Sequence, residues 1–129
     1  AQNNKLTVNN FSNAHEIIAL HLLPKSKRGV YRNCNTVVME HGTFKIQYEA
    51  AQNHEVNKLM MQLWEDIESL LYKDLSFEEV FYFASMIHMK FVNIHPFEDG
   101  NGRSGRLLKK WFLAEKLGKK AFYKLILKC

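Results

Sequence analysis

The sequence has few of the residues that cross-link or break a chain. Only two cysteines and two prolines occur in 129 residues, and Cys34 and Cys129 lie far apart. Reduced thiols in a cytoplasmic protein are therefore a better expectation than a disulfide. No apolar run approaches the ~18 residues that a membrane span needs, and the N-terminus lacks the pattern of a signal peptide. We therefore expect no membrane contact.

The remaining composition is that of one ordinary globular domain with a basic excess. Hydrophobic residues make up 47% and charged residues 24%, with a formal net charge of +5. A basic balance favours anionic ligands such as nucleotides. The lysines after position 109 are more typical of a solvated face than of a nucleic-acid site, so nucleic acid is not an expected partner.

The first residues predict a lead-in and a short helix. Residues 1–11 read as a polar lead-in. Asn13, followed three residues later by Glu16, resembles a capping box that opens a helix, and Pro24 stops this helix.

Apolar residues at helical spacing predict three further helices. They cover residues 54–72, 76–93 and 101–117, and residues 119–128 predict a short last helix. Asn53 is the expected cap of the first of these, and Ser76 with Glu79 forms a capping box for the next. The wide apolar surface of residues 76–93 predicts a central helix. The expected fold class is an all-α bundle.

Two short β-prone runs interrupt this helical pattern. The first is Thr36, Val37, Val38 and Met39, and the second covers residues 43–46 after a glycine. These lengths predict a small hairpin. A lone hairpin is only marginally stable, so it has to lean on the helices and is a candidate flap.

The most informative stretch is HPFEDGNGRSGR, from His95 to Arg106. Pro96 restricts His95 to an extended conformation, so the preceding helix has to end and the histidine lies in a loop. Phe97, a large apolar residue among polar neighbours, is the expected structural anchor of this loop. The polar residues and glycines that follow are not typical of a buried core, but they are typical of a site that binds phosphate.

Gly100, Asn101 and Gly102 predict an anion nest that leads into a helix N-terminus. Arg103 and Arg106 project from one side of the first helical turn, where two positive charges are unfavourable unless an anion offsets them. A phosphate chain would do so and accept bidentate hydrogen bonds.

The two remaining polar residues suit metal binding and proton transfer. Asp99 precedes the nest and is the natural ligand of a Mg²⁺ ion that bridges phosphate oxygens. His95 can take a proton from an attacking hydroxyl, since its ordinary pKa lies near the working pH. The alternative is a turn without a function. The fixed order of a base, a metal ligand, an anion nest and two arginines favours a functional site.

This stretch resembles the Fic-domain motif, HPFx(D/E)GNGRxxR, at every fixed position. The resemblance extends over residues 14–117 and includes a Tyr31–Arg32 pair before the hairpin. It implies a single Fic domain over residues 1–129, with a core at about 14–117 and a helical bundle with a β-hairpin flap. The end at Cys129, directly after a helical pattern, suggests a C-terminal truncation.

The resemblance also implies a role for each motif residue. His95 resembles the base that deprotonates a target hydroxyl, and Asp99 the Mg²⁺ ligand. Asn101 and Gly102 resemble positions that hold the α- and β-phosphates, assisted by Arg103, and Arg106 resembles the arginine that secures the γ-phosphate. Residues 36–39 would dock a target loop along an exposed strand edge.

The implied activity is transfer of AMP from ATP to a Ser, Thr or Tyr hydroxyl of a target protein. Transfer of another phosphate-containing group (phosphate, UMP or phosphocholine) and a nucleotide-binding regulatory module with little turnover are the alternatives. The target, the organism and the oligomeric state stay open. A bacterial effector of this type would be delivered into a host cell.

The source of control also stays open. Many Fic proteins are silenced by a helix with the pattern (S/T)xxxE(G/N). Two partial matches, Ser12 to Glu16 and Thr36 to Glu40, both fail at the last position. An inhibitor is therefore a separate antitoxin-like protein, lies beyond the ends of this chain, or is absent.

Overall fold

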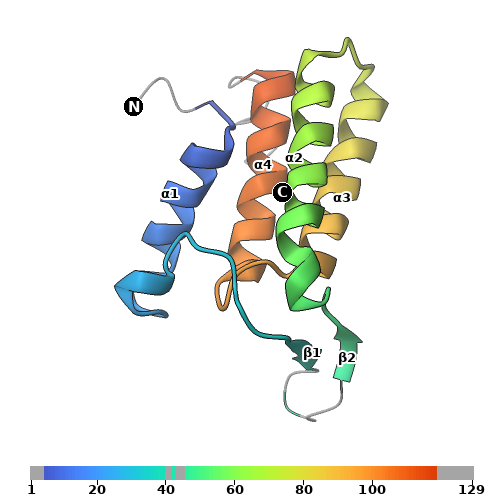
Figure 1. The fold of residues 1–129 in the computed structure, drawn as a ribbon. Helices are drawn as coiled ribbons and strands as arrows, with labels where there is room; N and C mark the ends of the chain where they lie inside the picture. The colour runs from blue at the N-terminus through green and yellow to red at the C-terminus, as the bar shows by residue number, and fades with distance from the viewer. Residues whose placement is uncertain (1–4, 40–41, 43–45, 119–129) are drawn as a thin grey trace.

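In the described part of the chain, four helices form the body and a pair of short strands extends from one end (Figure 1). The computed structural model describes residues 5–39, 42 and 46–118. The helices are α1 (Val8–Ile18), α2 (Val56–Tyr72), α3 (Phe77–Ile94) and α4 (Asn101–Leu117), with 3₁₀ turns at Lys25–Lys27 and Asn53–Glu55. The helical fold class is confirmed, whereas the last predicted helix lies outside the described residues. Within the described part, no helix is long and apolar enough to cross a membrane.

The first helix begins earlier than the sequence predicts. The Thr7 side chain, not Asn13, caps it by accepting a hydrogen bond of 3.2 Å from the Asn10 N–H. Leu6 and Phe11 are 5% and 2% exposed and belong to the core. The expectation of a polar lead-in is therefore wrong from Leu6 onward, because burying these two side chains favours helix over a solvated arm.

The other helix predictions are close to the structure. The capping box of α3 is confirmed, since the Ser76 hydroxyl accepts from the Glu79 N–H and the Ser76 N–H donates to Glu79 Oε1. Gly118 ends α4 with a φ of 80°, as expected of a C-terminal glycine. The expected cap Asn53 lies in a 3₁₀ turn, and α2 has no side-chain cap.

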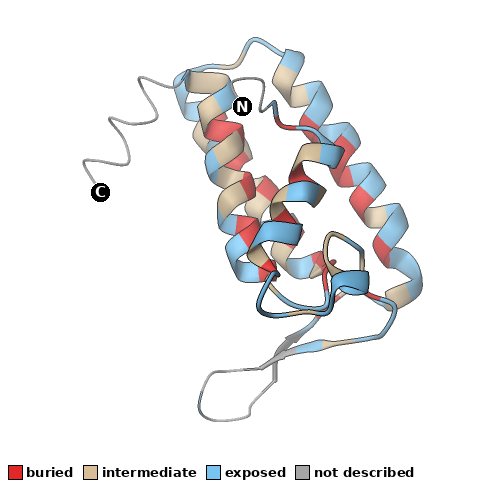
Figure 2. Cartoon of the chain, turned by 90° about the vertical axis from the view of Figure 1, so that its left-hand side faces the viewer, coloured by how far each residue is buried: buried red, intermediate tan, exposed pale blue. Residues whose placement is uncertain are grey.

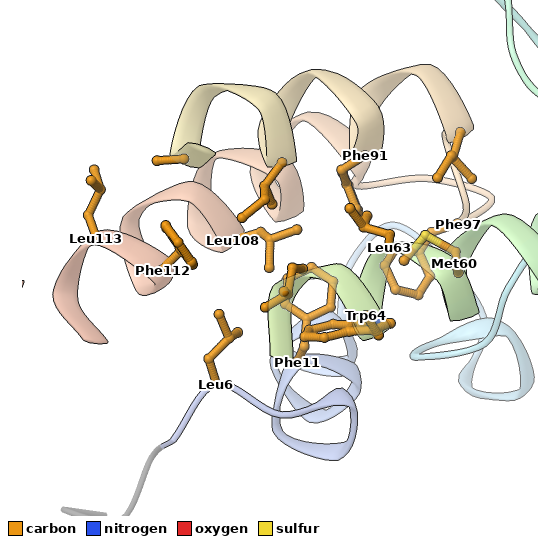
Figure 3. Close-up of a cluster of buried hydrophobic side chains, with 14 of the residues drawn as sticks. Leu6, Phe11, Met60, Leu63, Trp64, Phe91, Phe97, Leu108, Phe112 and Leu113 are labelled. Carbon is orange, nitrogen blue, oxygen red and sulfur yellow. The ribbon is translucent and has the colours of Figure 1, made fainter. Parts of the chain in front are cut away.

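The core lies where α1, α2, α3 and α4 face one another, and Figure 2 shows the buried residues on these inward sides. Phe11 of α1 is the central contact, with its ring centroid 5.5 Å from that of Trp64 and 5.6 Å from that of Phe91 (Figure 3). Gly105 lets α4 approach α3 closely, because a Cβ there would lie 3.2 Å from atoms of Phe91 and Val92. The core side chains are Leu6, Phe11, Val56, Met60, Leu63, Trp64, Ile67, Val80, Ala84, Ile87, Phe91, Ile94, Phe97, Leu108, Phe112 and Leu113.

Helix α3 is not enclosed by its neighbours, contrary to the prediction of a central helix. It packs on α2 and α4, and Tyr82 and Met89 on its opposite face and Phe77 in its first turn are large exposed side chains. Its apolar surface is therefore wider than its buried stripe.

Strands β1 (Val37–Met39) and β2 (Ile46–Glu49) pair antiparallel, with Val37 opposite Glu49. They extend beyond the end of the bundle at which the turn between α3 and α4 lies (Figure 1). The second predicted run, residues 43–46, falls largely outside the described residues. The arrangement brings the strands to the same end of the molecule as the motif.

Candidate functional site

The turn from α3 to α4 opens onto a pocket of about 310 Å³. Its lining combines all the polar motif residues singled out in the sequence with two neighbours, and consists of Leu22, His95, Glu98, Asp99, Gly100, Asn101, Gly102, Arg103 and Arg106. Thr36 and Val37 line a separate hollow beside Glu49, so the strands and the motif do not share one pocket. A volume near the lower end of the ~300–1,000 Å³ typical of ligand sites suits a small anionic ligand.

The backbone at His95 differs from the sequence prediction. His95 is not extended but left-handed, with φ 53° and ψ 59°, and it forms the C-cap of α3. Pro96 disfavours the right-handed helical region for His95, but it does not exclude the left-handed one that commonly ends helices. The helix does end here, as predicted, and His95 lies in the pocket wall.

The environment of His95 favours a neutral imidazole. Burial lowers its pKa most, and the nearby guanidinium of Arg32 lowers it further, while the Val92 backbone and Asp99 oppose this shift. Nδ1 is buried and makes no hydrogen bond of good geometry to any described residue. A ring that stays unprotonated near neutral pH can accept a proton.

The N-terminus of α4 provides an open anion site. Gly100 is its N-cap with φ 82°, no side chain of a described residue caps the helix, and its first turn carries no acidic residue. The first N–H groups of α4 therefore stay available, at the positive end of a helix of 17 residues. Arg103 and Arg106 are exposed at this end and form no ion pair within the described part of the chain.

The side chain of Asn101 belongs to the structure of the loop. It is only 3% exposed, and its side chain accepts from the Phe97 N–H at 2.9 Å and donates to the Phe97 carbonyl at 2.7 Å. The amide thus closes the loop over Phe97, which is fully buried. Only the backbone N–H of Asn101 is left to face a phosphate.

Asp99 fits a magnesium ion that the ligand helps to hold. Its side chain is exposed at the pocket, and Oδ1 accepts a hydrogen bond of 2.7 Å from the Gly100 N–H. The described residues contain no group of three His, Cys, Asp or Glu side chains that could enclose a metal. Mg²⁺ commonly takes one or two carboxylates and completes its shell with phosphate and water, so a single aspartate is compatible with it.

Two residues that support this site lie outside the motif. His15, from α1, is 1% exposed and accepts a hydrogen bond from the Gly29 N–H at Nδ1, so Nε2–H donates to the Asp99 carbonyl at 2.8 Å. Arg32, 5% exposed, donates to the His95 carbonyl at 2.6 Å. Both contacts join distant parts of the chain, and only the Tyr31–Arg32 pair before the hairpin drew attention to one of them.

A third long-range contact lies at the rim. Lys27 Nζ and Glu98 Oε2 are 2.9 Å apart, with side chains 45% and 32% exposed. An exposed ion pair of this kind contributes little to stability. It ties the basic turn at Lys25–Lys27 to the variable position of the motif.

Comparison with known proteins gives a consistent picture. The Fic/DOC family model matches residues 5–113. A protein adenylyltransferase Fic from Nematostella vectensis is 32% identical over 103 residues, which cover 80% of this chain and 22% of that protein. A uridine 5′-monophosphate transferase from Xanthomonas campestris pv. campestris is 48% identical over 31 residues, which cover 24% of this chain and 6% of that protein.

The fold agrees with these matches. The crystal structure of a Fic family protein from Desulfovibrio desulfuricans G20 superposes with a TM-score of 0.68 at 28% identity, over 84% of this chain and 30% of that one. The chain therefore spans less than a third of the relatives compared, and corresponds to one part of them.

Proposed function

Because the chain belongs to the Fic/DOC family, we propose that it transfers AMP from ATP to a Ser, Thr or Tyr hydroxyl of a target protein. The observation that carries this proposal is the shared pocket. A half-buried histidine whose pKa is lowered, a helix N-terminus that no described side chain caps and two arginines that pair with no described carboxylate line the same hollow. Each is suited to one part of a nucleotidyl transfer.

The chemistry is an in-line substitution at the α-phosphorus. The target oxygen forms a bond to that phosphorus, the bond to the bridging oxygen between the α- and β-phosphates breaks, and pyrophosphate leaves. His95 takes the proton of the attacking hydroxyl, which a neutral imidazole can do. Charge on the phosphates is stabilised by the N–H groups of Asn101 and Gly102 with Arg103, and Arg106 holds the γ-phosphate.

Two further parts complete the proposal. Asp99 would hold Mg²⁺, and the bound ion would neutralise phosphate charge. Strand β1, with Thr36 before it, would pair with a loop of the target by backbone hydrogen bonds and present its hydroxyl. A separate inhibitory protein remains one of the three sources of control.

The position of the label tests the reaction. The chain is incubated with cell lysate and Mg²⁺ and with ATP labelled at either the α- or the γ-phosphate, and the modified peptide is then identified by mass spectrometry. AMP transfer places only the α-label on protein. Transfer of the γ-label would instead show a kinase-like use of the same pocket, and binding without any labelled protein would favour a regulatory module.

UMP transfer is the second candidate, because one relative is named a uridine 5′-monophosphate transferase. The phosphate-binding residues do not distinguish the two bases, since they contact only the part that ATP and UTP share. Equimolar α-labelled ATP and UTP in one reaction decide between them. Preferential labelling from UTP would replace AMP with UMP as the transferred group.

A further inference from the structure

Arg32 is a buried cation whose bonds to the chain all end on backbone carbonyls. Its Nε donates to the His95 oxygen, Nη1 to that of Cys34, and Nη2 to that of Ala51, each at 2.6 Å. A fourth bond runs from Nη2 to the Ile94 oxygen at 3.0 Å, and the Arg32 backbone N–H donates to the Pro96 oxygen at 2.7 Å. Five hydrogen bonds thus converge from one residue on the segments around the motif.

Burying the charge of Arg32 costs desolvation free energy, which suggests that the residue has a role in the site. Among the described residues, Arg32 has no carboxylate partner, and burial lowers its pKa. A guanidinium stays charged even so, because its ordinary pKa lies far above neutral pH. The carbonyls of Ile94 and His95 lie at the negative end of α3, so the charge stabilises that helix end. An apolar residue would fill the space without this desolvation cost.

We propose that Arg32 is a positioning residue for the base, which holds the His95 backbone in its left-handed conformation and joins it to both ends of the strand pair. The inference rests on the proposed function in one respect, namely that His95 is the base. Arg32 itself is not among the residues that line the pocket, so it acts through His95.

The backbone at His95 needs such a restraint. A residue other than glycine loses about 1–2 kcal/mol in the left-handed region, and Pro96 leaves the extended region as the main alternative. A switch to the extended conformation would redirect both the imidazole and the His95 carbonyl. The bond from Arg32 Nε to that carbonyl favours the observed conformation over the extended one.

The same guanidinium connects the strands to the base. Cys34 precedes β1 and Ala51 follows β2, and both carbonyls accept from Arg32. The Ala51 N–H also donates to the Asn93 carbonyl of α3 at 3.2 Å. A shift of the strand pair is therefore passed to the backbone that carries the imidazole.

Charge gives this role a signature that a merely structural residue lacks. Arg32 lies behind His95, Asp99 acts on it from the loop, and Glu98, Arg103 and Arg106 line the pocket in front. Removing only the positive charge behind the ring should make the imidazole easier to protonate. Replacing Arg32 by lysine keeps the positive charge but loses most of the hydrogen bonds from the side chain to the four carbonyls.

The test follows the His95 imidazole by NMR titration in the full chain, alongside steady-state transfer. In Arg32→Gln, we expect the His95 midpoint to move to higher pH and kcat to fall about 100-fold, since a displacement of ~1 Å can cost that much, with KM for ATP within about twofold. In Arg32→Lys, the midpoint should stay near that of the wild type while kcat still falls. If Arg32→Gln does not fold, the fall in kcat in Arg32→Lys alone supports positioning, and its absence overturns it.

The matched control is Arg28→Gln. Arg28 also donates to two backbone carbonyls, those of Leu23 and Leu20, both at 2.9 Å, but contacts nothing at His95. This variant should leave the His95 titration unchanged. An unchanged midpoint and unchanged kcat in folded Arg32→Gln would overturn the inference. A shifted midpoint in a chain that transfers no nucleotide would keep the role of Arg32 and reject the proposed function instead.

Discussion

The imidazole of His15 lies flat against the ring of Phe97, with centroids 3.6 Å apart and planes inclined by 9°. The two residues come from opposite parts of the sequence, α1 and the turn after α3. The stack places an α1 side chain directly beneath the motif, and the hydrogen bond from His15 to the Asp99 carbonyl extends this support to the next part of the loop. Helix α1 thus belongs to the site as well as to the core.

Replacing His15 should weaken both the fold and the loop. His15→Ala removes two hydrogen bonds and a buried ring, and we expect it to lower the free energy of unfolding by about 2–4 kcal/mol. His15→Gln can still donate to the Asp99 carbonyl and accept from the Gly29 N–H, so it should lose less. Urea unfolding measures both. His54→Ala, at an exposed histidine, serves as control, and equal losses in the two His15 variants would contradict the hydrogen-bond account.

Removal of the proposed base should affect turnover and spare nucleotide binding. His95→Ala is expected to lower kcat by about 10²–10⁴-fold, the usual contribution of a general base. ATP affinity, measured by calorimetry, should change little because the phosphates bind to α4. Transfer at the wild-type rate would show that another group takes the proton.

The pH profile of transfer should reflect the lowered pKa of His95. Burial and Arg32 hold this pKa below its ordinary value of 6.5, so the imidazole remains neutral and active to lower pH than a free histidine. The rate should therefore be flat near neutral pH and decline on acidification with a midpoint below 6.5. Circular dichroism at each pH controls for unfolding. A midpoint at or above 6.5 would contradict the described environment.

Comparing ATP with ADP should separate the roles of the two arginines of α4 in phosphate binding. Each charge-assisted contact contributes about 1.5–3 kcal/mol, or roughly 10–100-fold in affinity. Arg106→Ala should weaken ATP binding by that factor and leave ADP binding nearly unchanged, since ADP lacks the γ-phosphate. Arg103→Ala should weaken both. Calorimetry with both nucleotides measures the difference, and an equal loss for ATP and ADP in Arg106→Ala would remove its assigned role.

The buried amide of Asn101 should be required for the loop. Asn101→Ala leaves the N–H and carbonyl of Phe97 without their partner, and we expect the free energy of unfolding to fall by about 2–4 kcal/mol. The matched control is Asn57→Ala on the exposed side of α2, which should change it by less than about 0.5 kcal/mol. A loss of nucleotide binding without any loss of stability would point instead to direct contact between this amide and phosphate.

Local patterns predict most of the helices and the composition of the pocket. The capping box at Ser76 and Glu79 and the glycine after Leu117 act within one helical turn, so their outcome depends on nothing distant. The start of α1 is different, because Thr7 and Asn13 are both acceptable caps. The burial of Phe11 among side chains of α2 and α3 decides between them.

The support of the site could not be predicted in this way. Arg32 and His15 contact residues 63 and 84 positions away. No local sequence pattern predicts which residue either of them contacts. The conformation of His95 depends on one of these contacts, so a rule for residues before proline gives the wrong region. The sequence marks Asn101 as a side chain that can hydrogen-bond, but it does not show that the amide bonds to the backbone of Phe97.

The contacts around the motif also order the assembly of the molecule. His15 to Asp99, Lys27 to Glu98 and Arg32 to His95 span 84, 71 and 63 residues, whereas α2, α3 and α4 are joined by short turns. Closing long loops is entropically costly and tends to follow local structure. The three later helices should therefore form a bundle before residues 5–36 dock on it. The pocket beside His95 should then be completed only when this segment docks.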